Sequence, residues 1–166
     1  MESIIYNQGR NFTCQQYCIF GIIWHNFNQW LPQKSVEKWI AKNDLKDPKK
    51  KWWLGSIEAA EYIAKEIARK VMTFGFRDAD FMKYWEQGKA IGISMKADAD
   101  FWRDTVDWKL DSYKHLRWPS SHAVYIHNGS WGLMINSFWK ALPPCRFDLE
   151  KFDTKWLTNL LCFTII

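Results

Sequence analysis

The sequence is poor in the residue types that define several specialised classes of protein. Its 166 residues include only four cysteines, five prolines and eight glycines. No two cysteines form a Cys-x-x-Cys pair, and no histidine lies at zinc-ligand spacing from them. The aspartates of residues 97–119 also lack the spacing of an EF-hand loop. We therefore expect no metal site, and we predict no cofactor.

Long hydrophobic runs are absent as well. The longest apolar stretches, residues 18–24 and 156–166, are too short to span a bilayer. The first six residues have neither the basic region nor the apolar run of a secretory signal. We therefore expect no membrane partner, no Sec-dependent secretion, and thiols that stay free rather than forming disulfides.

The composition is that of a folded protein. Hydrophobic residues make up 48% of the chain and charged residues 25%, which excludes disorder and predicts one domain over residues 1–166. Aromatic residues make up 17%, including 12 tryptophans, and we expect most of them in the core. The predicted core tryptophans are Trp24, Trp102 and Trp108.

The charge is a weak indicator of partners. Its net value of +5 fits a nucleic acid, an anionic cell wall or an ordinary solvated surface, and we favour the last. The basic run at residues 49–51 precedes Trp52 and Trp53. This pattern is more typical of a surface loop beside core residues than of a nucleic-acid site, so we expect no nucleic-acid partner.

Hydrophobic periodicity divides the chain into a helical part and a strand-forming part. The predicted helices are residues 13–30, 36–42 and 56–73, the last capped by Ser56. The predicted strands are residues 90–95, 123–126 and 131–138. This order indicates an α+β fold with a mainly helical half at 1–75 and a mainly β half at 88–166. The apolar end of segment 147–166 is either a final strand or a contact with a partner.

Cys14 is the first residue that indicates chemistry. Thr13 and Gln16 fit a capping box, which predicts Cys14 as the first residue of its helix. Free backbone N–H groups and the helix dipole at that end favour a thiolate, which is the nucleophilic form. A buried structural cysteine is the alternative, and Cys18, one turn further on, is interpreted in that way.

His122 and Asn136 lie on the two strands of the predicted hairpin. With a three-residue loop at Asn128-Gly129-Ser130, paired positions sum to 258, which places these two residues directly opposite each other. An asparagine amide there would orient the imidazole as a base or acid. A two-residue loop would change the register by one. The other histidines have no such partner and are interpreted as structural; they are His25, His115 and His127.

A third element precedes the cysteine. Gln8, in Asn7-Gln8-Gly9, lies six residues before Cys14. Its side-chain amide and the backbone N–H of Cys14 would together donate hydrogen bonds to an oxyanion during acyl transfer.

In this order the motifs resemble those of the papain-like cysteine peptidases. The shared motifs are Asn-Gln-Gly followed by Cys14, the segment Ser121-His122-Ala123, and Asn136-Ser137-Phe138-Trp139. Small members of this kind occur among bacteriophage and bacterial proteins. The resemblance covers roughly residues 5–140 and implies a papain-like fold, with the cysteine at a helix N-terminus and an antiparallel sheet or barrel in the second half.

The resemblance also implies roles for individual residues. Cys14 is the nucleophile, His122 the base and acid, Asn136 the orienting residue and Gln8 the oxyanion donor. Further residues are expected beside a peptide or protein substrate; these are Gly55, Ser56, Ser121, Phe138 and Trp139. The implied location is the cytoplasm or a virus particle, with a larger assembly as a further partner.

Several positions depart from the family pattern. Gln15 replaces the tryptophan that follows the nucleophile, Ser121 and Trp139 replace glycines, and Phe138 replaces a tryptophan. Asn11 and Phe12 stand where the family has Cys-Gly, so its disulfide near the cleft is missing. Two alternatives therefore remain: a hydrolase of peptidoglycan peptides, and a papain-like module that binds or builds a particle without catalysis.

Overall fold

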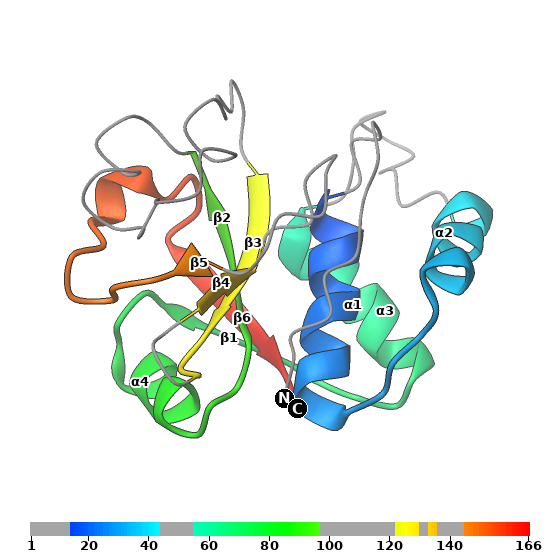
Figure 1. Cartoon of the computed structure of the whole chain (residues 1–166), viewed down its shortest axis with the longest axis horizontal. Coiled ribbons are helices and arrows are strands. Elements are labelled where there is room, and N and C mark those ends of the chain that lie inside the picture. The colour runs from blue at the N-terminus through cyan, green and yellow to red at the C-terminus, as the bar shows by residue number, and fades with distance from the viewer. Residues whose placement is uncertain (1–13, 44–54, 97–121, 130–132, 136–144) are drawn as a thin grey trace.

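The computed structural model describes residues 14–43, 55–96, 122–129, 133–135 and 145–166 (Figure 1). Of the predicted site residues, Gln8, Ser121, Asn136, Phe138 and Trp139 lie outside these ranges, as do the predicted core residues Trp102 and Trp108. The side chain of His122 also lies outside the description, although its backbone is part of a strand.

The described part of the chain has an α+β fold. Its helices are α1 (Cys14–Phe27), α2 (Gln33–Lys42), α3 (Ser56–Glu66) and α4 (Ala79–Glu86), with a short 3-10 helix η1 (Thr154–Trp156). Its strands are β1 (Val71–Gly75), β2 (Ile91–Met95), β3 (His122–His127), β4 (Leu133–Ile135), β5 (Cys145–Arg146) and β6 (Leu161–Ile165).

These strands form one antiparallel sheet in the order β1-β6-β2-β3-β4-β5. The last strand, β6, lies between β1 and β2, so the apolar end of the chain is a strand in the centre of the sheet. Helices α1, α2 and α3 lie on one side of the sheet, and α4 lies on the other (Figure 1). Because strand side chains alternate between the two faces, the sheet contributes to two separate cores.

The core on the α1 side is built from small and aliphatic residues. It contains Ile19, Ile22 and Ile63 of the helices together with Tyr125 of β3 and Phe163 of β6. Cys18 is buried as predicted, with 2% of its surface exposed, and Trp24 is buried as well. On the opposite face the core is rich in aromatic rings; these include Phe74, Phe81, Trp85, Phe147, Phe152 and Trp156.

The prediction of one helix over residues 56–73 is wrong. Helix α3 ends at Glu66, because Ala68 adopts a left-handed conformation with φ 54° and the Arg69 N–H donates to the Ala64 carbonyl. Residues 71–75 then pair with β6 as strand β1. The first 75 residues are thus mainly helical in their described part but also contribute one strand to the sheet. Ser56 is the first helical residue rather than the cap, which is Gly55.

Helix α4 is an element that the periodicity did not predict. Asp78 caps it, accepting hydrogen bonds from the Phe81 N–H (2.8 Å) and from the Gly75 N–H (2.7 Å). The helix buries its apolar residues against β1 and the aromatic core. It lies between the two predicted halves, in a segment that the sequence analysis assigned to neither.

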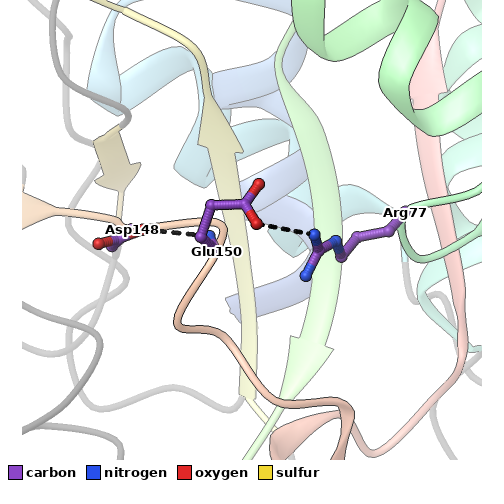
Figure 2. Close-up of polar contacts among 3 residues, drawn as sticks. All are labelled: Arg77, Asp148 and Glu150. Carbon is purple, nitrogen blue, oxygen red and sulfur yellow. Dashed lines mark hydrogen bonds and ion pairs between the residues drawn. The ribbon is translucent and has the colours of Figure 1, made fainter.

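One surface ion pair connects the turn before α4 to the C-terminal segment. The Arg77 guanidinium donates to the Glu150 carboxylate at 3.0 Å, and the Glu150 N–H donates to Asp148 Oδ1 (Figure 2). Both charged side chains of the ion pair are substantially exposed, at 40% and 77%. An exposed pair of this kind contributes about 0–1 kcal/mol, so we assign it a minor role in stability.

Candidate functional site

Cys14 lies where the helical layer meets the sheet. It is the first residue of α1, as predicted, and it is partly buried. Its sulfur accepts a hydrogen bond from the backbone N–H of Ala123, as well as local ones from Gln15 and its own N–H. Since Ala123 follows His122 at the start of β3, the fold brings the predicted nucleophile next to the residue that adjoins the predicted base.

The electrostatic environment of this sulfur differs from the prediction. Burial raises the pKa of the Cys14 thiol above its usual value, and the three backbone hydrogen bonds, which favour the thiolate, offset only part of that effect. The backbone N–H groups thus favour the thiolate, as expected, but burial outweighs them. In the environment of the described residues, Cys14 is therefore a neutral thiol at neutral pH. A base must accept its proton before the sulfur can attack.

The hairpin has a longer loop than predicted. The strand pairs are Tyr125↔Ile135, Ile126↔Met134 and His127↔Leu133, so paired positions sum to 260 rather than 258. Strand β3 continues through His127, and five residues, 128–132, separate it from β4. The register on which direct opposition of His122 and Asn136 was based is therefore wrong. A shift of two residues keeps each side chain on the same face of the sheet.

A second helix N-terminus lies beside the first. Ser56, at the start of α3, has its Oγ 3.3 Å from the Oγ of Ser94 in β2. Ser94 in turn pairs with Ala123, the residue that hydrogen-bonds to Cys14. This chain of contacts brings the predicted substrate residues Gly55 and Ser56 to the same end of the sheet as Cys14.

Gly55 presents accessible backbone at this end. It is exposed and extended, with φ −59° and ψ 157°. A methyl group added to it would meet no atom of the described residues within 4 Å, so space beside it is open in this part of the structure. Extended, exposed backbone of this kind pairs readily with an extended peptide.

Sequence reasoning missed Ser94, because its position depends on the pairing of β2 with β3, which are far apart in the sequence. It named Gln16 as part of a capping box, but this residue is 1% exposed, and both polar atoms of its amide lack a hydrogen-bond partner among the residues that the structure describes. Thr13, the other half of the predicted capping box, lies outside them.

Two further searches of the described residues gave no candidate. No group of three or more histidine, cysteine, aspartate or glutamate side chains lies close enough together in them to hold a metal ion. None of the helices that the structure describes has both the length and the apolar character needed to cross a membrane.

Comparison with protein-family models finds no match, and comparison with curated proteins finds none either. The functional argument therefore depends on the residues and on the geometry described above.

Proposed function

We propose that the protein is a papain-like cysteine peptidase that hydrolyses peptide bonds. The observation that carries this proposal is the hydrogen bond from the Ala123 N–H to the Cys14 sulfur. It joins a cysteine at a helix N-terminus to the residue after His122, although more than one hundred positions separate them in the sequence. We propose in addition that the His122 imidazole reaches this sulfur, which would supply the nucleophile and base that thiol hydrolysis needs.

In the proposed reaction, the Cys14 thiol gives its proton to the His122 imidazole and the sulfur bonds to the substrate carbonyl carbon. The His122 imidazolium then protonates the leaving amine as the C–N bond breaks, which leaves a thioester on Cys14. Water, deprotonated by His122, hydrolyses the thioester, releases the carboxylic acid and restores the thiol. Asn136 orients the imidazole, and Gln8 with the Cys14 N–H stabilises the oxyanion.

The raised pKa of Cys14 determines how this reaction begins. Since burial favours the neutral thiol, the proton moves to His122 during attack rather than before substrate binds. Binding of the substrate excludes water from the sulfur and from His122. Catalysis therefore depends on His122 as a general base, a contribution that is typically about 10²–10⁴-fold in rate.

The substrate is a peptide that lies in an extended conformation along Gly55 and Ser56. The open space beside Gly55 and its extended backbone support this placement. Ser121, Phe138 and Trp139 border the same cleft by the family resemblance. The peptide comes either from a protein or from the stem of peptidoglycan. The experiment below distinguishes these sources by which of the two substrates is cleaved.

The test is hydrolysis of two substrates, an unstructured protein and purified peptidoglycan, by the wild type and by Cys14→Ala and His122→Ala variants. The matched control is Cys18→Ala, which removes the buried thiol one turn further along α1. We expect cleavage by the wild type and the control, and none by the other two variants. Cleavage that persists in Cys14→Ala would remove the proposal.

A second candidate is a papain-like binding module without turnover. The upward shift of the Cys14 pKa favours it, because an inactive site has no need to stabilise a thiolate. This candidate predicts a folded protein that cleaves neither substrate and whose Cys14 reacts with a peptide electrophile equally fast in the wild type and in His122→Ala. The two candidates are thus separated by cleavage and by the dependence of Cys14 reactivity on His122.

A further inference from the structure

Helix α1 and strand β3 lie side by side and run in the same direction (Figure 1). Three contacts mark their interface from one end to the other: Cys14 with Ala123, Gly21 with Tyr125, and His25 with His127. The first contact belongs to the proposed site. The last lies at the far end of the same interface, about 16 Å along the helix axis at 1.5 Å per residue.

The two histidines are packed ring against ring. Their centroids are 4.2 Å apart with an interplanar angle of 38°. His127 is 5% exposed, and His25 is partly buried. The His25 Nε2–H donates to the Gly88 carbonyl at 2.9 Å, which fixes His25 against the turn that leads into β2. His25 therefore joins α1 to both β2 and β3.

The charged groups around this pair include two cations. Lys89, next to Gly88, and Arg69, in the turn before β1, both lie over the ring of Phe27, at 5.8 Å and 4.1 Å from its centroid. On β3 the neighbouring titratable group is the phenol of Tyr125, whose ring centroid is 6.5 Å from that of His25. Of these two cations, Lys89 disfavours a further positive charge on His25.

Both imidazoles are held in the neutral form. Burial, together with the charge of the neighbouring His25, lowers the pKa of His127 to about 4. Burial also lowers the pKa of His25, as does Lys89, while the bond to Gly88 partly opposes the shift. Two positive charges on rings packed this closely would repel each other strongly.

We propose that the His25–His127 pair is an acid-sensitive latch, which holds the C-terminal end of α1 on the sheet when neutral and releases it when protonated. The proton comes from solvent, and the released histidine becomes a solvated imidazolium. This device does not depend on the proposed peptidase activity. It loosens the same helix–strand interface that carries Cys14 at its other end.

The pKa values set the pH range of release. A released histidine titrates near 6.5, its ordinary value, and latched His127 titrates at about 4. The contribution of the pair is therefore complete above about pH 6.5 and is lost as the pH falls toward 4. Between pH 7 and pH 5 the equilibrium constant for release should rise by about 20-fold.

The experiment is backbone amide hydrogen exchange at pH 7 and pH 5, corrected for the intrinsic rates, on the wild type, His127→Phe and His25→Gln. The reporter is the Ala90 N–H, which donates to the Asn26 side chain of α1 at 2.8 Å. The amides of β1, in the same sheet but outside this interface, report global unfolding.

From pH 7 to pH 5 we expect the exchange of Ala90 in the wild type to rise by about 20-fold while staying faster than that of β1, and we expect this rise to be absent in His127→Phe. An equal rise in His127→Phe, or Ala90 and β1 exchanging together, would overturn the latch. If the variants fail to fold, the ring of wild-type His127 can be titrated by NMR. A midpoint near 4 supports the proposal, and a midpoint near 6.5 overturns it.

Discussion

Gly21 of α1 lies against the ring of Tyr125 of β3. A methyl group on residue 21 would overlap Cε1 of that ring and would lie 3.1 Å from Cζ. The ring is buried and belongs to a central strand, so it has little room to move. The missing side chain at Gly21 therefore allows α1 to approach the sheet closely enough for Cys14 to contact Ala123.

The first prediction follows from that contact. Gly21→Ala should destabilise the protein by about 1–3 kcal/mol through overpacking, although alanine is the better helix former by about 1 kcal/mol. Gly55→Ala is the comparison: no atom of the described residues lies within 4 Å of the added methyl, so only the preference of an N-cap for glycine over alanine acts there. Urea unfolding of both variants measures the difference. Equal stabilities for the two variants would show that the close approach of α1 and β3 is absent in solution.

The second prediction concerns the buried amide of Gln16. Because neither of its polar atoms has a partner among the described residues, replacing it with Met removes a desolvation cost of about 1–3 kcal/mol. We expect Gln16→Met to raise the free energy of unfolding. The control is Gln87→Met at the exposed end of α4, which should change it by less than about 0.5 kcal/mol. A loss of stability in Gln16→Met would mean that the amide is satisfied.

The third prediction concerns Asn26, which connects α1 to two strands. Its amide donates to Thr164 Oγ1 and to the Ile165 carbonyl, and its Oδ1 accepts from the Ala90 N–H. Asn26→Ala would break all three bonds and leave buried groups unpaired, at a cost of about 2–4 kcal/mol.

Asn43→Ala is a suitable comparison for Asn26→Ala, because Asn43 makes its side-chain bonds at the surface end of α2. We expect it to cost less than about 1 kcal/mol. Thermal unfolding of the two variants tests the ranking. A larger loss of stability in Asn43→Ala than in Asn26→Ala would contradict the hydrogen bonds that connect Asn26 of α1 to the sheet.

The fourth prediction concerns the pH dependence of Cys14. Since its pKa lies above the usual value, the thiolate fraction grows only as the pH rises through and beyond about 9. Alkylation of Cys14 by iodoacetamide in the absence of substrate should therefore increase steadily from pH 6 to pH 9. Mass spectrometry of the modified peptide measures this rate. A plateau at acidic pH would indicate a preformed thiolate–imidazolium pair instead.

Local signals predicted local structure well. The start of α1 at Cys14 and the strand texture of β2 and β3 follow from capping residues and from alternation. The burial of Cys18 and Trp24 follows from their places on the apolar side of a helix. These features depend on neighbours within one or two turns of the chain, which a sequence displays directly.

The features that were missed depend on distant contacts. The apolar stripe that continues to Val71 resembles a longer helix, but pairing with β6 makes β1 a strand. Asn128-Gly129 favours a short turn, yet the ladder of β3 and β4 leaves a five-residue loop. The pKa of Cys14 follows from burial beneath the folded layers, which the capping pattern alone does not contain.

The most direct test of the proposed site is covalent capture by a peptide that carries an electrophile, such as a peptidyl vinyl sulfone. The reaction is followed by intact-mass spectrometry on the wild type, Cys14→Ser and His122→Ala. We expect one adduct per chain, located on Cys14, absent in Cys14→Ser and formed about 100-fold or more slowly in His122→Ala. Adduct formation on another cysteine, or an unchanged rate in His122→Ala, would contradict the assignment of Cys14 and His122 as nucleophile and base.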